Sequence, residues 1–532
     1  MRHDLALTSI PNMVRVSARE HRDAIAIVDG DAQYTYTELE AAMLDSTRAM
    51  IALGVEPGDR VALCGPNSAS WIIAALGIQG AGGVLIPVNT RFRGQEIGHL
   101  LTKGDATAFV TVGEFLGNDY VDMVRTAVPQ ARALERIVIL DDTPVDGTTT
   151  FAEAVRRGRE SVSVEAAEAA IAAVQGDHLS DIMFTSGTTG SPKGVMLTHA
   201  QSLRAYGDMA DILELRSDDC ILVIPPFFHA FGYKAGWMMG LMKGMRVIPQ
   251  RTFDAEDIMH KIQTHRVSCV FGPPTIFVDV MSHPRFKEFD LSSLRVTTVS
   301  AAAIPVSLIH DLKSVLGFEV VLSGYGLTEA TAIVTVSRPS DDAETVANRA
   351  GRPFPDVEVK AVDVLGNDLA PGEEGELLVH GYNVMQGYWR EPDQTAAAIT
   401  SDGWLKTGDI GFVDERGYVK VTDRMKDMFI VGGFNAYPAE IEDVLMRFEK
   451  IQHAAVVGIP DARMGEVGAA YVVPAPGYEL TQEEVVAYAR ENLANFKVPR
   501  EIHIVDDLPR NASMKVLKHV LKQERLREAS PS

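Results

Sequence analysis

A segment dense in hydroxyl side chains and glycine follows a predicted buried strand at residues 182–184. The segment consists of Thr185, Ser186, Gly187, Thr188, Thr189 and Gly190, with Lys193 shortly after it. Hydroxyls and glycine amides packed this densely can wrap a polyphosphate, and the lysine adds positive charge. The segment is not a Walker A loop, because the spacing differs and no Ser or Thr follows the lysine. The alternative is a flexible surface loop, but a mobile linker would not need to begin where a strand ends.

A second polar segment, Tyr-Gly-Leu-Thr-Glu, follows the predicted strand at residues 320–323. The ring of Tyr325, next to Gly326, can stack on a base. The Thr328 hydroxyl can reach a phosphate, and the Glu329 carboxylate can hold a Mg²⁺ ion that bridges phosphates. Alone the segment is a weak signal, but together with the first loop it predicts a nucleotide site.

A third pair of polar residues lies further along the chain. Asp409 follows a Thr-Gly dipeptide, and Arg424 belongs to the next strand unit. The carboxylate suits the two hydroxyls of a ribose, and the guanidinium can brace them. The alternative is an ordinary surface Asp–Arg pair.

These side chains need elements that bring them together. From about residue 180 to 330, short apolar segments alternate with helical patterning. Such alternation predicts a mostly parallel, covered sheet, whose ligands lie beyond the carboxyl ends of the strands. A helix is predicted at 305–316, with Gly317 as its stop signal. The predicted strands lie at 182–184, 221–224, 269–271, 296–299 and 320–323.

Residues 350–422 have a different character, since short strands are separated only by turns. This pattern predicts a small antiparallel β module. Its predicted strands lie at 357–362, 376–379 and 418–421.

The pattern changes again after this module, to a compact α+β segment. An amphipathic helix follows Pro438, and Thr481 with Glu484 forms a capping box that opens another helix. We predict an α/β fold with a large N-terminal domain, residues 1–424, that contains parallel-sheet subdomains and a small β-barrel module. A smaller α+β C-terminal domain comprises residues 425–532.

The chain is long and acidic. Its 532 residues exceed what one core normally organises, so at least two domains are expected. With 50 basic against 72 acidic residues, the net charge is −22. Such a surface repels phosphate backbones, and we expect no nucleic-acid partner.

Cysteine usage and hydropathy indicate in which compartment of the cell the protein works. Cys64, Cys220 and Cys269 are too scattered for a disulfide framework or a zinc cluster, and each is predicted to be a small buried side chain. We expect a reducing, cytoplasmic location, because the start of the chain has no signal-peptide pattern. The most apolar stretch, residues 71–88, is broken by glycines and a proline and predicts a buried helix followed by a strand, not a membrane span.

The three polar segments, in this order, resemble those of the adenylate-forming superfamily of acyl-CoA synthetases, adenylation domains and luciferases. The resemblance runs from about residue 20 to 525. It implies an AMP-forming acid–CoA ligase that uses ATP, Mg²⁺ and coenzyme A. A carboxylate and ATP would give acyl-AMP and pyrophosphate, and CoA would then give acyl-CoA and AMP. The partners would be a small carboxylic acid and CoA, and the sequence leaves a homodimer open.

The resemblance also implies roles for the polar residues. Tyr325 would stack on adenine, Thr328 would contact phosphate and Glu329 would bind Mg²⁺. Asp409 and Arg424 would hold the ribose.

Lys515 is similar in position to the family's C-terminal catalytic lysine. One departure is that Met514 stands where the family normally has glycine. If this position requires a positive φ, the methionine costs about 1–2 kcal/mol. Either the loop adopts an ordinary conformation or the geometry of adenylation is slightly altered.

In the superfamily the C-terminal domain is mobile and rotates about a hinge, which corresponds here to Lys426. The rotation withdraws the lysine and admits the CoA thiol. Gly433 would line a narrow thiol tunnel where only bare backbone fits, although a plain turn is the alternative.

The acyl pocket is implied by two segments. Ala301, Ala302 and Ala303 match the family's adenine-lining segment, and their methyl groups would narrow the floor of the pocket. His229 stands in a wall of aromatic residues, where the family has a gating aromatic or histidine, although a satisfied core histidine is the alternative. The wall contains no acid to pair with an ammonium, which disfavours amino acids as substrates.

Segments next to this pocket look especially like those of bacterial ligases that activate the bicyclic propanoate left from steroid rings C and D. The alternatives are a medium- or long-chain fatty-acyl-CoA synthetase and a stand-alone adenylation enzyme that loads a carrier protein. A nucleotide-binding protein that has lost its activity is disfavoured, because every charged residue of the implied site is present.

Overall fold

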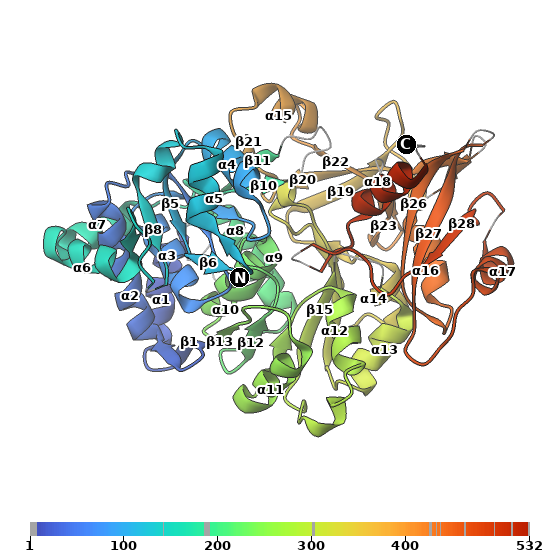
Figure 1. Ribbon diagram of the computed structural model, residues 1–532, viewed down its shortest axis with the longest axis horizontal. Coiled ribbons are helices and arrows are strands. Elements are labelled where there is room, and N and C mark those ends of the chain that lie inside the picture. The colour runs from blue at the N-terminus through green and yellow to red at the C-terminus, as the bar shows by residue number, and fades with distance from the viewer. Residues whose placement is uncertain are drawn as a thin grey trace.

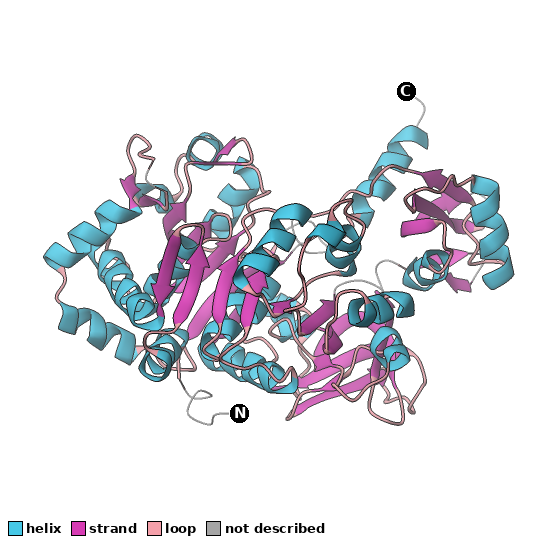
Figure 2. Cartoon of the chain, turned by 90° about the horizontal axis from the view of Figure 1, so that it is seen from below, coloured by secondary structure: helices cyan, strands magenta, loops and turns pink. Residues whose placement is uncertain are grey.

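The computed structural model describes residues 8–141, 143–185, 192–300, 304–424, 428–431, 434–436, 438–461, 464–493, 495–511 and 514–529. The N-terminal part contains two large β-sheets, a four-stranded antiparallel sheet and a two-stranded sheet, β6 (Glu114–Phe115) with β7 (Asn118–Asp119) (Figure 1). A separate sheet with its own helices forms the C-terminal part, which lies at one end of the molecule in both views (Figure 2).

The first large sheet contains the strand that leads to the predicted phosphate loop. This strand, β10 (Leu179–Thr185), is parallel to β4 (Val84–Val88) and antiparallel to β11 (Lys193–Thr198). The chain therefore passes from β10 into a hairpin partner and not into a crossover helix. The other strands of this eight-stranded sheet are β3 (Arg60–Cys64), β5 (Ala106–Thr111), β8 (Ile137–Ile139), β9 (Thr149–Thr150) and β21 (Gly387–Tyr388).

The most apolar stretch of the sequence forms α3 (Ala69–Gly80) and then β4. All but one residue of α3 are buried, and the Ser68 hydroxyl caps the helix by accepting a hydrogen bond from the amide of Trp71. The predicted buried helix followed by a strand is confirmed. Among the described residues, no helix combines the length and apolar character needed to cross a membrane.

The second large sheet has nine strands, and a parallel block forms its centre. Four of the five strands predicted between residues 180 and 330 lie in this sheet, whereas the strand at 182–184 belongs to the first. The alternation of strands and helices thus spans two sheets. The parallel block is β12 (Cys220–Val223), β13 (Arg246–Pro249), β14 (Cys269–Val270), β15 (Val296–Ser300) and β16 (Val320–Tyr325), with β1 (Ile25–Asp29), β2 (Ala32–Thr35), β17 (Thr335–Val336) and β18 (Arg352–Pro353) toward the edges.

Helices cover both sheets, and the largest hydrophobic core contains side chains from strands of both. The predicted helix at 305–316 is observed as α13 (Val306–Ser314), and Gly317 beyond it has a φ of 77°. The other main helices are α1 (Ile10–His21), α2 (Tyr36–Ala52), α4 (Gly94–Lys103), α5 (Tyr120–Ala127), α6 (Phe151–Ser161), α7 (Val164–Ala173), α8 (His199–Ile212), α11 (Ala255–His265) and α12 (Pro274–Met281).

The predicted β module is a four-stranded antiparallel sheet that forms a half-barrel. Its strands are β19 (Val357–Val362), β20 (Gly375–Gly381), β22 (Leu405–Val413) and β23 (Val419–Arg424). Ala361, Leu377 and Val419 form a small core on one face.

The C-terminal part has an independent hydrophobic core, formed between its sheet and its helices. The predicted helix after Pro438 is α16 (Pro438–Met446), and the capping box of Thr481 and Glu484 opens α17 (Gln482–Asn492). The other elements are β24 (Phe429–Val431), β25 (Phe434–Ala436), β26 (Ile451–Asp461), β27 (Gly465–Pro474), β28 (Glu501–Ile504) and α18 (Lys518–Ala529).

All three cysteines carry free thiols and are buried, as predicted. Cys64 ends β3, whereas Cys220 and Cys269 begin β12 and β14. Burial raises the pKa of each thiol, so none of them is activated as a nucleophile.

Candidate active site

The predicted phosphate loop connects β10 to β11. Thr185 at the end of β10 pairs with Lys193 at the start of β11, so the two strands form a β-hairpin. The Lys193 ammonium donates a hydrogen bond to Gln394 Oε1 at 2.8 Å and lies 4.9 Å from the centre of the Tyr388 ring. Ser186, Gly187, Thr188, Thr189 and Gly190 lie outside the described residues.

Tyr388 connects the lysine to the predicted metal ligand. Strand β21, which ends at Tyr388, pairs with β11 next to Lys193. The Tyr388 hydroxyl donates a hydrogen bond to Glu329 Oε1 at 3.0 Å. Burial and the negative charge of Glu329 raise the pKa of Tyr388, so the phenol stays protonated and remains a donor. Tyr388 could not be predicted from the sequence, because its place depends on the pairing of strands far apart in the chain.

The short helix that carries Thr328 and Glu329 is fixed by the loop that follows it. Thr331 and Ala332 have φ values of 56° and 61°, in the left-handed region that residues with a side chain seldom adopt. The Tyr206 hydroxyl holds this loop by donating a hydrogen bond to the Thr331 carbonyl oxygen at 3.2 Å. A β-carbon at Gly326 would lie 2.2 Å from the Ala332 carbonyl oxygen, so the close approach of the two segments requires glycine.

Tyr325 and Asp409 meet directly. The Tyr325 hydroxyl donates a hydrogen bond to Asp409 Oδ2 at 2.6 Å, and Asp409 is only 2% exposed. In the half-barrel, Asp409 on β22 stands opposite Arg424 on β23. The second and third predicted segments therefore form one site, and the aromatic ring and the carboxylate hold each other in place.

The floor of this site is described only in part. Ser300, the last residue of β15, pairs with Gly324 on β16, the residue directly before Tyr325. Ala301, Ala302 and Ala303 lie outside the described residues, as do Lys426 and Gly433.

His229 caps the helical turn α9 (Ala230–Gly232), where its Nδ1 accepts a hydrogen bond from the amide of Phe231 at 3.2 Å. A π-helical segment, η2 (Tyr233–Met238), follows; such segments occur frequently at functional sites. His229 is exposed to solvent. Desolvation by neighbouring protein atoms, together with the positive charge of Lys515, lowers the pKa of the imidazole to about 4. The imidazole is therefore neutral near pH 7, and the charge of Lys515 lies close enough to influence its protonation.

Lys515 lies at the end of a tight β turn in the C-terminal part. The amide of Asn511 donates to the Lys515 carbonyl oxygen at 2.8 Å, and the amide of Met514 donates to the Asn511 carbonyl oxygen at 2.9 Å. Met514 has a φ of 62°, the left-handed conformation that glycine adopts most easily. The first alternative that the sequence leaves open, an ordinary loop conformation, is therefore wrong.

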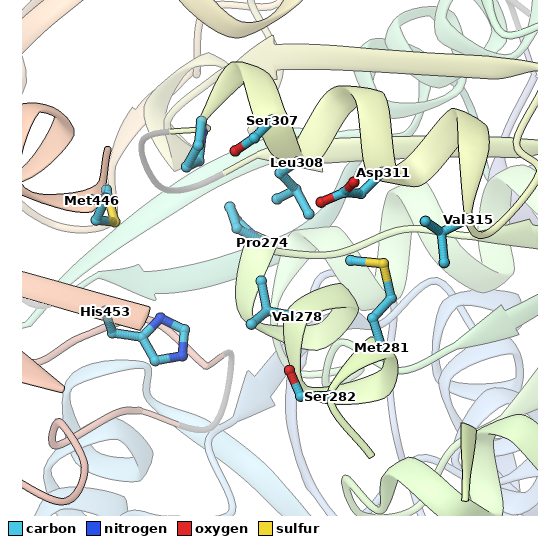
Figure 3. A pocket seen from close by; sticks show the side chains of 11 residues that line it. Pro274, Val278, Met281, Ser282, Ser307, Leu308, Asp311, Val315, Met446 and His453 are labelled. Carbon is cyan, nitrogen blue, oxygen red and sulfur yellow. The ribbon is translucent and has the colours of Figure 1, made fainter. Parts of the chain in front are cut away.

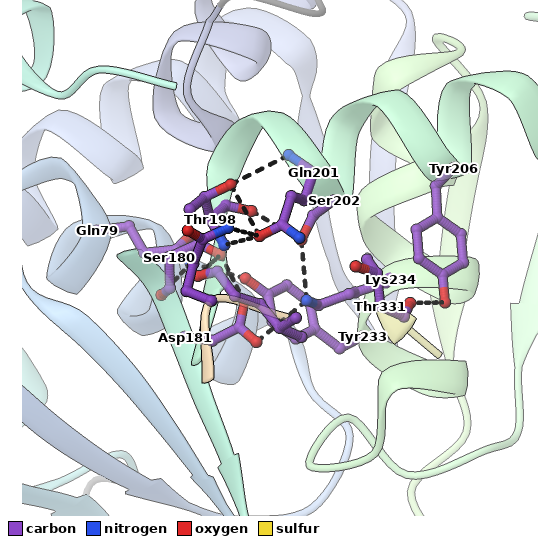
Figure 4. A network of polar contacts seen from close by, with 12 residues as sticks. Gln79, Ser180, Asp181, Thr198, Gln201, Ser202, Tyr206, Tyr233, Lys234 and Thr331 are labelled. Carbon is purple, nitrogen blue, oxygen red and sulfur yellow. Dashed lines mark hydrogen bonds and ion pairs between the residues drawn. The ribbon is translucent and has the colours of Figure 1, made fainter. Parts of the chain in front are cut away.

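A buried ion pair connects η2, which follows the predicted acyl wall, with β10, the strand before the predicted phosphate loop (Figure 4). Lys234 of η2 lies 3.1 Å from Asp181 of β10, and both side chains are fully buried. The Lys234 ammonium also donates to the Ser202 hydroxyl at 2.9 Å, and Gln79 Nε2 donates to the Tyr233 hydroxyl at 2.7 Å. Desolvation lowers the pKa of Lys234, while Asp181 favours its charged form. No local sequence pattern predicts this pair, since the two residues meet only in the folded chain.

A metal ion at this site would depend on its substrate for most of its ligands. Among the described residues, no group of three or more His, Cys, Asp or Glu side chains could hold an ion. A single carboxylate such as Glu329 fits Mg²⁺ that arrives with phosphate oxygens, because Mg²⁺ is commonly bound by one or two carboxylates plus substrate phosphates.

Two large, mostly parallel sheets, a half-barrel sheet and a smaller C-terminal part are the architecture of adenylate-forming enzymes. The chain belongs to the AMP-binding enzyme family: the family's profile matches residues 14–389, and the profile of the AMP-binding enzyme C-terminal domain matches residues 440–515. Within this family it is an AMP-forming acid–CoA ligase.

Two curated relatives are similar along their whole length. Both are named 3-[(3aS,4S,7aS)-7a-methyl-1,5-dioxo-octahydro-1H-inden-4-yl]propanoyl:CoA ligase. The protein from Rhodococcus jostii is 44% identical over 97% of this chain and 99% of its own length, and that from Mycobacterium tuberculosis is 45% identical over the same shares. Among solved structures, ATP-bound MatB from Rhodopseudomonas palustris is 28% identical over 98% of this chain and 100% of its own, with a TM-score of 0.84.

Proposed function

We propose that this ligase activates a bulky alicyclic propanoic acid, of the kind left when steroid rings C and D remain as a bicyclic ketone. The observation that carries this proposal is the similarity to two ligases named for such a substrate, at 44% and 45% identity over 97% of the chain. The half-reactions are those of the family: the acid is first joined to AMP with release of pyrophosphate, and the acyl group then passes to CoA.

The wall of the acyl site fits a bulky acid that carries no ammonium group. His229 is neutral near pH 7 and offers no counter-ion for a substrate ammonium. The residues that flank His229 in the chain belong to an aromatic cluster: Tyr233 and Trp237 stack with their centroids 4.9 Å apart, and Trp71 meets Phe227 edge-on at 5.4 Å. A wall braced in this way presents a fixed shape, which suits a rigid ring system better than a flexible chain.

The nucleotide roles follow from the contacts in the site. The Tyr325 ring, held by its hydrogen bond to Asp409, would stack on adenine, while Asp409 with Arg424 would bind the ribose. The segment 185–190, with Lys193, would hold the phosphates, and Thr328 would contact them. Bound Mg²⁺ would supply positive charge that offsets the charge of the phosphate oxygens.

Glu329 would hold this ion, oriented by the Tyr388 hydroxyl. Ala301, Ala302 and Ala303 would form the floor between adenine and the acyl group.

Lys515 would act in the first half-reaction. A carboxylate oxygen of the acid attacks the α-phosphorus of ATP, the bond to the bridging oxygen breaks, and pyrophosphate leaves. Negative charge concentrates on oxygens of two anions, and an ammonium positioned there lowers the barrier; loss of such a donor typically costs about 10²–10³ in rate. The influence of the Lys515 charge on His229 supports this position beside the acyl site.

The second half-reaction would need a different arrangement of the domains. Rotation of residues 425–532 relative to residues 1–424, about a hinge at Lys426, would withdraw Lys515. The CoA thiol would then enter along a tunnel lined by Gly433, attack the acyl carbonyl carbon and release AMP.

A panel of acids tests the proposed substrate. Pyrophosphate release is measured with the bicyclic propanoate, octanoate and ferulate, each with ATP and Mg²⁺, and CoA is compared with a carrier protein as acceptor. We expect the highest kcat/KM with the bicyclic propanoate and CoA. A preference for octanoate would exclude the steroid-type substrate, and transfer to the carrier protein alone would exclude the CoA ligase assignment.

A further inference from the structure

The β hairpin that carries Lys515 contacts the N-terminal domain through an ion pair. The Arg510 guanidinium lies 3.8 Å from Asp279 Oδ2 on α12 and 3.4 Å from Asp507 in its own segment. The Arg510 side chain is only 11% exposed and that of Asp279 26%, so solvent screens the pair incompletely. We propose that the Arg510–Asp279 pair is a clasp that holds the Lys515 hairpin on the N-terminal domain during adenylate formation.

The clasp and the lysine are connected through a short stretch of hydrogen-bonded backbone. Arg510 and Val516 form an antiparallel bridge, and the amide of Leu517 donates to the Pro509 carbonyl oxygen at 2.8 Å. The amide of Lys515 also donates to Asn511 Oδ1 at 2.9 Å. Because these bonds tie the two strands of the hairpin together, fixing Arg510 against α12 also fixes the position of Lys515.

Apolar packing between the two domains is incomplete near this pair. A cavity of about 380 Å³ separates α12 and α13 from the C-terminal domain (Figure 3). Its walls include Val278, Met281 and Leu308 on one side and Met446 and His453 on the other. Since close packing is interrupted here, a directional contact between charged groups contributes more to fixing the orientation of the C-terminal domain.

The two partners of the clasp are not equivalent. Burial on α12 raises the pKa of Asp279, and the charge of Arg510 opposes this effect. If Arg510 is removed, a partly buried carboxylate loses its cation, whereas removal of the Asp279 charge leaves Arg510 with Asp507. His453 adds no competing positive charge, because burial and the nearby Arg510 lower its pKa to about 4. The cleaner single substitution is therefore Asp279→Asn.

Loss of the clasp should affect one half-reaction and not the other. A contact made in only one of two orientations shifts the population between them when it is removed. The inference rests on the proposed role of Lys515, which acts only while the hairpin is docked.

The test compares the two half-reactions in the full-length enzyme carrying Asp279→Asn or Arg510→Gln. The first is acid-dependent release of pyrophosphate, and the second is formation of the thioester from supplied acyl-AMP and CoA. We expect the first to fall about tenfold and the second to stay unchanged or to rise. Arg510→Lys should retain part of the first rate, and the exchanged pair Asp279→Arg with Arg510→Asp should restore most of it.

The matched control is Arg525→Gln, which breaks the ion pair of Arg525 with Glu501 inside the C-terminal domain. It should leave the ratio of the two rates as in the wild type. Equal losses in both half-reactions, or an unchanged ratio in Asp279→Asn, would overturn the clasp. Lys515→Ala, measured in parallel, tests the proposed function separately. If Lys515→Ala still releases pyrophosphate at the wild-type rate, the proposed role of the lysine is wrong. If Lys515→Ala loses this rate but the clasp variants keep the wild-type ratio of the two rates, only the clasp is wrong.

Discussion

Met514 occupies the left-handed position of the hairpin that delivers Lys515, with a φ of 62°. A side chain there costs about 1–2 kcal/mol, while glycine loses about 0.5–1 kcal/mol more backbone entropy on folding. Met514→Gly should therefore stabilise the C-terminal domain by roughly 0.5–1 kcal/mol, measured by urea denaturation. Met514→Ala keeps the strained backbone and serves as the control. If alanine stabilised the domain as much as glycine does, backbone strain would not be the cause.

Tyr388 gives a second prediction at the level of single residues. Tyr388→Phe removes the hydroxyl that donates to Glu329, a bond to a charged group worth about 1.5–3 kcal/mol. We expect a higher apparent KM for Mg²⁺ and a fall in kcat of about tenfold or more. The control is Tyr382→Phe, since the Tyr382 hydroxyl donates to Asp208 on α8 instead. A Mg²⁺ dependence that changes equally in both variants would contradict the role of Tyr388.

The chemistry proposed for the site comes from residue types, whereas its contacts could not be predicted from the sequence. The base, ribose and metal roles suggested for Tyr325, Asp409 and Glu329 come from their side-chain chemistry and from the order of the segments. The bond between Tyr325 and Asp409 and the place of Tyr388 arise from strand pairing over long distances in the chain, which no local pattern encodes.

Among the helices and strands, features encoded by adjacent residues were predicted correctly, whereas the pairing of distant strands was not. The strand at 357–362 is observed with the predicted bounds, because alternation of apolar and polar residues is a local property. The capping box at Thr481 is likewise read from adjacent residues. By contrast, the strand at 182–184 joins a different sheet from the four that follow it, since the choice of sheet depends on the partner strand β4.

The ion pair between β10 and η2 leads to a prediction about elements. Lys234→Met would leave the Asp181 carboxylate fully buried without a cation, which costs about 3–5 kcal/mol. Replacing both charges, as in Asp181→Asn with Lys234→Met, should cost much less. Chemical denaturation of the two variants measures the difference. Equal destabilisation of the single and the double variant would show that the buried charge is not the source of the loss.

At the scale of the whole molecule, buried neutral histidines predict sensitivity to acid. Burial lowers the pKa of His199 to about 3, and its Nδ1 accepts a hydrogen bond from the amide of Ile10. Between the ordinary histidine pKa of about 6.5 and this value, the unfolded chain binds a proton that the folded chain does not, so stability falls as the pH falls.

We expect the Tm to decrease from pH 6.5 toward pH 4 and the decrease to be smaller in His199→Gln. The exposed His310 provides the control, and His310→Gln should keep the wild-type profile. A pH profile of the Tm that is unchanged in His199→Gln would contradict this assignment.

The buried pair of Lys234 and Asp181 has a further consequence for laboratory evolution. Because each charge depends on the other, any single exchange at these positions passes through an unstable intermediate. Selection for a new acid substrate should therefore leave both residues untouched and accumulate its changes elsewhere around the acyl group. We therefore expect the wall of the proposed acyl pocket that contains this pair to stay constant during selection, while residues on its other walls change.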